Sequence, residues 1–224
     1  MTLWFEEQHK LLLAILIAVD LAFIAVHVIA NERHGSMTSL YTDLGPAGIW
    51  GFSMAMVAAV ALHRTFRMSD FTIYMAWAAT LVVVALDDLA QIHEVGGWWL
   101  DDRLGLPEVL GLQGRDIGEL IVWAALAVPL LAAIAVTRAD ADRRARRDTT
   151  VLFVLMTLLV VVGAGFDALH MATVEDYEGV SLLGVLEDGG ELIVLSLVVS
   201  SAVAAHRWRV RAQLATASPS EAVH

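Results

Sequence analysis

The sequence predicts an all-α, polytopic membrane protein with six transmembrane helices. Hydrophobic residues occupy 58% of the 224 positions, charged residues occupy only 17%, and the mean hydropathy is +0.68. A soluble domain does not need this much apolar surface. Six stretches approach the roughly 20 apolar residues that a helix needs to cross a hydrocarbon core about 30 Å thick. They lie near residues 11–30, 47–62, 71–95, 117–136, 151–172 and 182–205.

The first stretch is predicted to be a mature helix rather than a secretory signal. Asp20 and His27 interrupt its apolar run, and no small-residue cleavage site follows it. Residues 1–210 are therefore taken as a single transmembrane domain, and residues 211–224 as a flexible cytoplasmic tail.

The later helices contain an internal repeat. The fourth helix opens with "DIGELIV" and the sixth with "DGGELIV", while the second opens with the weaker match "DLGPAGIW". The helices before the fourth and sixth end in "LVVVALDDLAQ" and "VVVGAGFDALH". We therefore expect three in-out-in hairpins, which as parallel repeats would enclose a central site. The alignment pairs Asp88 with Asp167, Gln91 with His170, and Glu119 with Glu191.

The distribution of basic residues predicts the orientation in the membrane. Lys and Arg near helix ends are retained on the cytoplasmic side. Only Arg33, Arg103 and Arg115, of 14 basic residues, fall on the opposite side of the predicted hairpins. Both termini are therefore expected in the cytoplasm, and the chain is expected to be a multi-pass protein of a prokaryotic cytoplasmic membrane.

Acidic and imidazole side chains are predicted to form a layer near the outer ends of the helices. At 1.5 Å per residue, His27, Asp88 and Asp167 each lie about 17 residues, or roughly 25 Å, from the cytoplasmic start of their helices. Counting back along the descending helices places Glu119, Glu187 and Glu191 in nearly the same band.

Helical periodicity predicts which side chains of the third helix share a face. Asp87, Gln91 and Glu94 follow the i, i+4, i+7 spacing of one face. His93 should point about 120° or more away from that face, toward a neighbouring gap.

A divalent metal is the simplest partner for such a layer. Carboxylates at membrane depth cost several kcal/mol unless partnered, and no Lys or Arg is expected within these helix segments. The chain has no cysteine, which leaves His and carboxylates as the strong ligands. Four-helix di-iron and di-manganese proteins use carboxylates and a Glu-x-x-His motif in this way. The favoured ligands for Fe, Mn or Zn are Asp88, Asp167, His170, Glu187 and Glu191; second-shell or alternate ligands are Asp87, Gln91, His93, Glu94, Glu119, Asp188 and His27.

Structural roles compete with this hypothesis. Asp116 followed by Glu119 also fits a capping box at a helix start. Asp20 either bonds across to a Ser or Thr, or continues a proton path toward the cytoplasm. The glycines beside the acids favour close helix approach rather than phosphate binding. The acids expected to form only a solvated outer rim are Asp101, Asp102, Glu175, Asp176 and Glu178.

The segments "LDDLAQIHE" and "LEDGGELI" resemble a group of uncharacterised bacterial multi-pass membrane proteins. Those proteins carry an Asp-Asp/Glu then His-Glu pattern on one helix and a Glu-Glu/Asp-x-x-Glu pattern on a late helix. The resemblance covers residues 71–205 and implies that the acids and His93 of these two segments belong to one site. It implies no particular activity.

The leading hypothesis is an integral-membrane metalloprotein, specifically a di-metal oxidoreductase or hydrolase acting on a lipid or other apolar substrate. The first alternative is a cation or proton transporter or channel that uses Asp20. The second is a b-type haem electron carrier that uses two of His27, His93 and His170. The expected partners are membrane lipids and the apolar substrate, and no nucleic acid.

Overall fold

A computed structural model describes residues 2–30, 40, 45–109, 111–173 and 182–217. These residues form seven α-helices, which confirms the all-α prediction. The helices are α1 (Thr2–Ala30), α2 (Pro46–Ser69), α3 (Thr72–Ala90), α4 (Ile92–Leu104), α5 (Gly114–Thr137), α6 (Arg143–Thr173) and α7 (Leu182–Ala217).

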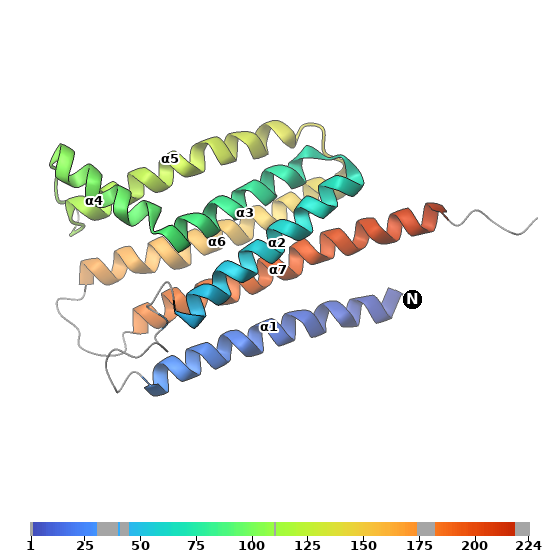
Figure 1. Ribbon diagram of the computed structural model, residues 1–224, viewed down its shortest axis with the longest axis horizontal. Coiled ribbons are helices and arrows are strands. Elements are labelled where there is room, and N and C mark those ends of the chain that lie inside the picture. Colours follow the sequence, from blue (N-terminus) through green and yellow to red (C-terminus); the bar gives the residue numbers. More distant parts are fainter. Residues whose placement is uncertain (1, 31–39, 41–44, 110, 174–181, 218–224) are drawn as a thin grey trace, which may run out of the picture.

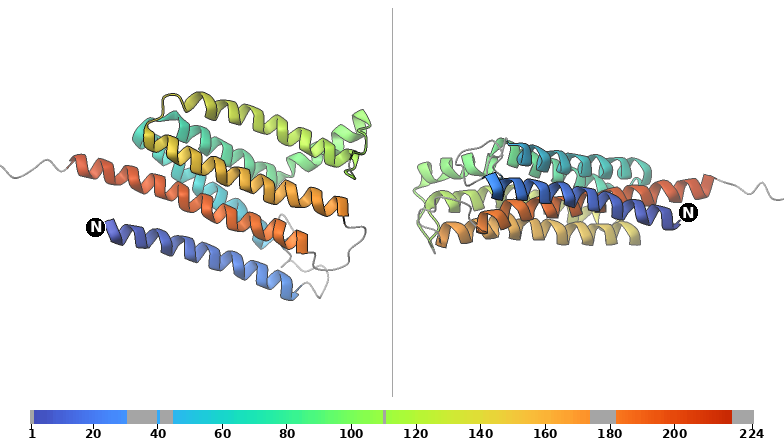
Figure 2. Two further views of the ribbon diagram at one scale, coloured as in Figure 1. Left: turned by 180° about the vertical axis from the view of Figure 1, so that it is seen from behind. Right: turned by 90° about the horizontal axis from the view of Figure 1, so that it is seen from below.

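The long helices lie side by side along one axis and alternate in direction (Figure 1). The start of α1 and the end of α7 lie at the same end of the bundle, together with the α2–α3 and α5–α6 turns. Figures 1 and 2 both place α1 at the edge of the bundle, where it packs on α7. The bundle therefore has a terminal end, defined by these turns and helix ends, and an opposite end covered in part by α4.

Five of the described helices contain segments long and apolar enough to cross a membrane. This supports a multi-pass membrane protein. The sixth predicted crossing, residues 182–205, falls within α7 and is not one of the five. The candidate spans are Lys10–Ile29, Pro46–Ser69, Thr72–Ala90, Gly114–Thr137 and Arg143–Phe166.

The prediction of one continuous helix over residues 71–95 is wrong. α3 ends at Ala90, and α4 begins at Ile92. Gln91 between them adopts a left-handed conformation, with φ of 51° and ψ of 41°. The Asp87 carboxylate accepts the backbone N–H of His93 at 3.0 Å, which satisfies one of the amide groups left open at the start of α4. Periodicity alone could not show this change of direction.

The connection between the predicted spans 71–95 and 117–136 is partly helical, because α4 extends to Leu104 and packs closely on α5. Gly97 and Gly118 are buried at the crossing of the two helices. A Cβ atom on Gly118 would overlap the backbone of Gly97, so the two helices approach more closely than side chains would permit.

Large apolar side chains fill the bundle nearer the terminal end. Tyr74, Trp77 and Leu81 of α3 are fully buried, and they belong to one core with Leu62 of α2 and Val198 of α7. This packing leaves the opposite end of the same helices to form a cavity.

Ion pairs and aromatic contacts hold the terminal end together. Arg209 of α7 donates to both carboxylate oxygens of Asp142 at 2.9 Å and lies over the ring of Phe71. The hydroxyl of Tyr74 donates to Asp148 at 2.8 Å. Arg209 thus ties α7 to the α5–α6 turn at this end.

Candidate functional site

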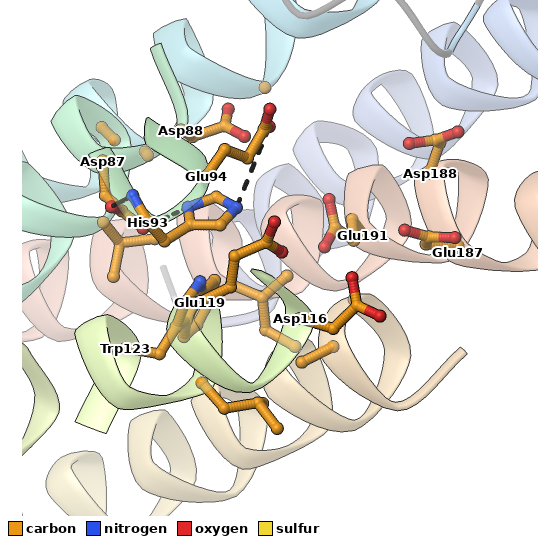
Figure 3. Close-up of a pocket in the computed structure, with 18 of the residues that line it drawn as sticks. Asp87, Asp88, His93, Glu94, Asp116, Glu119, Trp123, Glu187, Asp188 and Glu191 are labelled. Carbon is orange, nitrogen blue, oxygen red and sulfur yellow. Dashed lines mark hydrogen bonds and ion pairs between the residues drawn. The ribbon is translucent and has the colours of Figure 1, made fainter. Parts of the chain in front are cut away.

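A cavity of about 480 Å³ lies between α2, α3, α4, α5, α6 and α7, at the end away from the termini. We call it the acidic cavity because most of its charged lining residues are carboxylates. Figure 3 shows these side chains facing one space from α3, α4, α5 and α7. The lining acids of the described chain are Asp87, Asp88, Glu94, Asp116, Glu119, Glu187, Asp188 and Glu191.

The structure brings together most of the site residues predicted from the sequence. Of the favoured ligands, Asp88, Glu187 and Glu191 line the acidic cavity. The side chains of Asp167 and His170, on α6, lie outside the described residues. The alternate ligands that line the cavity are Asp87, His93, Glu94, Glu119 and Asp188.

Two predicted alternates do not line this cavity in the described structure. Gln91 forms the junction between α3 and α4. His27 is buried near the end of α1, where its Nδ1 accepts the backbone N–H of Leu40 at 3.1 Å. The acidic layer predicted from depth alone therefore separates into the cavity and a distinct position on α1.

His93 and Asp87 form the best-defined polar pair of the site. The Nδ1 of His93 lies 2.9 Å from Oδ2 of Asp87, and its Nε2 lies 4.0 Å from Oε1 of Glu94. The prediction that His93 points away from the Asp87 face is wrong. It assumed one straight helix, but the backbone breaks at Gln91 and turns the His93 side chain toward Asp87. With Nδ1–H donating to Asp87, Nε2 is the ring nitrogen left for a ligand or proton.

The surroundings of His93 favour its charged form. Burial lowers the pKa of His93, but the hydrogen bond to Asp87 and the negative charges of Asp87, Glu94 and Glu119 outweigh it, so the pKa lies above its usual value. The ring also packs edge-on against Trp123, with centroids 5.4 Å apart. His93 is therefore held in position from two sides.

Arg115 is a basic residue of the cavity that sequence reasoning missed. It precedes the predicted span 117–136, but α5 begins at Gly114, so Arg115 is helical and lines the cavity. Its Nε lies 3.3 Å from Oδ1 of Asp116, and its guanidinium lies over the ring of Trp98. The expectation that no basic residue accompanies the acids is wrong, although one guanidinium cannot balance eight carboxylates.

Asp116 also has a structural role at the start of α5. Its Oδ2 accepts the backbone N–H of Gln113 at 2.7 Å, as the third residue of a capping box does. A capping role is confirmed for Asp116, but the predicted box of Asp116 with Glu119 is wrong, because Gln113 is the N-cap and Asp116 is the third residue. Glu119 lies one turn further along α5 and lines the cavity.

Glycines bring the walls of the cavity close together. Gly163 of α6 lies against the carboxylate end of Glu191, and Gly190 of α7 lies against Val162. A side chain at either glycine would need the space that its neighbour occupies. The prediction that these glycines permit close helix approach is confirmed.

The lining changes from acidic to apolar within one helical turn. On α3, Val84 lies four residues before Asp88; on α5, Trp123 lies four residues after Glu119; on α7, Leu195 lies four residues after Glu191, and all six residues line the cavity. Four residues correspond to roughly 6 Å along a helix. The acids therefore occupy the part of the cavity nearer α4, and apolar side chains the part nearer the middle of the bundle.

Asp20 has a structural partner set of its own. Its two carboxylate oxygens accept the Trp50 indole N–H at 2.9 Å and the Ser196 hydroxyl at 2.5 Å. These bonds tie α1 to α2 and α7. The prediction that Asp20 bonds across to a Ser or Thr is confirmed.

The acids of the described chain are distributed around the cavity rather than gathered at one point. No three of its His, Asp or Glu side chains are close enough together to hold a metal ion. A cation bound here would therefore need side-chain rearrangement, water ligands, or donors outside the described set.

A model of the family described as Domain of unknown function (DUF8692) matches residues 10–206. The chain belongs to this family. The match includes every residue that lines the acidic cavity. Neither the curated proteins nor the solved structures provided a match for this DUF8692 member.

Proposed function

We propose that this DUF8692 member is a membrane protein that binds divalent cations in its acidic cavity, and that it uses them in a reaction on an apolar or lipid substrate. One observation carries the proposal. Among the described residues, eight carboxylates and one carboxylate-oriented imidazole line a single cavity within a bundle of apolar helices.

Electrostatics supports a cation as the ligand. Carboxylates sharing a cavity repel one another at low dielectric, and a multivalent cation relieves the repulsion of several at once. The cationic groups among the described lining residues are Arg115 and, when protonated, His93. Both already contact acids of their own, Asp116 and Asp87. A net negative cavity therefore remains for an added cation.

The chemistry of the donor set suits Mn, Fe or Zn. His93 would offer Nε2 while Asp87 orients the ring from Nδ1, which is the usual outer-shell support of a metal-binding imidazole. Asp88, Glu119 and Glu191 would supply oxygen ligands from three other helices. Asp167 and His170 remain predicted ligands from α6.

Two reaction classes are consistent with such a site. A bound metal would supply Lewis acidity, and would activate water if it is zinc or manganese or dioxygen if it is iron. His93 can hold or release a proton at Nε2 while Asp87 stabilises its charged form. The apolar part of the cavity, formed by Val84, Trp123 and Leu195, would hold the substrate out of water.

The orientation follows from the basic residues. We propose six crossings, with α7 as the sixth, and both termini in the cytoplasm. The supporting observations are the shared end of the α1 start and the α7 end, and the basic character of the turns there. The acidic cavity would then lie near the outer face of the membrane.

The alternatives have less support. A cation path would have to cross the packed core around Trp77 and Leu62, and Asp20 is engaged by Trp50 and Ser196. For haem, His27 does not line the cavity that holds His93, so this pair does not form an axial couple there, and the pairs with His170 involve a side chain outside the described residues.

Elemental analysis of the purified protein tests the proposal. We expect Fe, Mn or Zn in stoichiometric amount, and loss of the metal when Asp88→Asn and Glu191→Gln are combined. A folded, metal-free preparation whose melting temperature does not respond to these three metals would refute it.

A further inference from the structure

Helix α5 is held on one side only. It packs on α4 and α3 and does not pack closely on α6 in the described structure. Its buried residues are Gly114, Gly118 and Ile134, and most of its other side chains are at least partly exposed. Nevertheless, α5 and α6 both line the acidic cavity. The cavity wall between them is thus formed by two helices that are not packed together.

We call this wall the α5–α6 seam and define it by Leu120 on α5 and Gly163 and Ala164 on α6. Leu120 lines the cavity and is 45% exposed, so it is not covered by a neighbouring helix. On α6, the small residues Gly163 and Ala164 line the cavity about one turn from Leu159. The neighbouring interfaces differ, since glycines bring α4 against α5 and α6 against α7.

The surroundings of the seam belong to candidate membrane spans. Leu120 lies in the span Gly114–Thr137, and Ala164 lies in the span Arg143–Phe166. Exposed apolar side chains flank it, including Ile121 on α5 and Val161 on α6. With these spans in the membrane, as proposed above, this wall faces lipid rather than bulk water.

We propose that the acyl chain of a membrane lipid enters the acidic cavity sideways, through the α5–α6 seam. The chain would lie against Trp123, Leu159 and Leu195, with the polar end of the lipid directed toward the acids. This inference rests on the proposed function, because it names the apolar substrate and its route.

The shape and polarity of the cavity fit this occupant. Its volume of about 480 Å³ lies within the usual range of small-molecule sites. The change from acids to apolar residues within one helical turn matches an amphiphile, whose polar and apolar parts are joined end to end. A soluble polar substrate would leave the apolar part of the lining unused, and it would have no reason to enter from the membrane.

Photolabelling in lipid vesicles tests the route. The probe is a phosphatidylcholine with a diazirine in the middle of one acyl chain, added as a minor component to phosphatidylcholine vesicles that contain the full-length protein. Leu159 is only 6% exposed, so lipids on the outer surface do not reach it, whereas Val128 of α5 is 65% exposed and serves as the surface control. We expect label at both Leu159 and Val128, located by mass spectrometry.

Closing the seam should block labelling inside the cavity, at Leu159, without affecting labelling on the surface, at Val128. The chain has no cysteine, so Leu120→Cys combined with Ala164→Cys can be bridged by a bifunctional maleimide without other reaction. We expect bridging to abolish the label at Leu159 and to leave the label at Val128 unchanged. The same protein without the linker is the matched control. Ala164→Trp, which fills the seam without a linker, should have the same effect.

These measurements test the lipid route and the metal site independently. Absence of label at Leu159 in the unmodified protein, or label that persists after both forms of closure, overturns the lateral route. Metal content measured on the same vesicles tests the metal site. Bound metal without label at Leu159 rejects only the lipid route. Label at Leu159 without bound metal supports the lipid route and rejects the metal chemistry.

Discussion

Asp87 and His93 are joined twice across the break between α3 and α4. The Asp87 carboxylate accepts the backbone N–H of His93 at 3.0 Å and contacts its Nδ1 at 2.9 Å. One carboxylate thus both caps a helix and orients the imidazole of the cavity. Removing it should affect stability and the site together.

The Asp87–His93 pair should make stability depend on pH. The pKa of His93 is raised in the folded protein, so the pair contributes fully below the unfolded pKa of about 6.5, and this contribution is lost as pH rises through the folded pKa. The melting temperature of metal-free protein in detergent should therefore fall as pH rises from about 6.5 through the folded pKa of His93. Asp87→Asn should flatten this change and cost about 1–2 kcal/mol at low pH. An unchanged pH profile in the variant would contradict the assignment.

The Gly97–Gly118 crossing should tolerate no side chain. Gly118→Val would place atoms against the Gly97 backbone, which cannot move aside as a flexible side chain can. We expect a loss of about 2–4 kcal/mol in unfolding free energy, measured by denaturant titration in detergent. Gly165→Ala is the control, because its new Cβ would make only an ordinary contact with Val161 at 3.9 Å. Equal stability of the two variants would refute the close crossing.

Asp20 should act as an anchor for α1. Asp20→Ala removes the acceptor of Trp50 and Ser196 and should lower the unfolding free energy by about 1–3 kcal/mol. A double-mutant cycle with Ser196→Ala should give a coupling of about 1 kcal/mol. A variant with unchanged stability and altered proton flux in vesicles would instead favour the proton path.

Metal-dependent stabilisation should depend on the acids of the cavity. Added Mn, Fe or Zn should raise the melting temperature, and the gain should shrink in acid as carboxylates and imidazoles bind protons. Asp167→Ala with His170→Ala should abolish the gain. Asp102→Asn is a suitable control because Asp102 is exposed and does not line the cavity. Asp101 is unsuitable, since it is half-buried and accepts the backbone N–H of Leu106 at 3.1 Å.

The proposed orientation can be tested by cysteine labelling. Glu108 and Asp140 are exposed residues in turns at opposite ends of the bundle. A membrane-impermeant maleimide added to intact cells should label Glu108→Cys and should reach Asp140→Cys only after the cells are opened. Ala141, in the same turn, is buried and would give a false negative. The opposite labelling pattern would reverse the topology.

Much of the site was predictable because its signals are local. Apolar runs between charged segments mark the helices, and acids at the ends of those runs mark a layer that needs partners. Asp88, Glu187 and Glu191 were found in this way, and all three line the cavity. Similar depth did not ensure proximity, however, since His27 is buried elsewhere.

By itself, the sequence determined that this is an all-α chain with membrane-length helices and acids near one end, since composition and run length depend only on neighbours along the chain. Only the tertiary structure decided which of those acids meet. The left-handed turn at Gln91 brought His93 back to Asp87, and an early start of α5 brought Arg115 into the cavity. The physical reason is that periodicity assumes a straight helix, whereas a backbone break and packing against other helices redirect every side chain that follows.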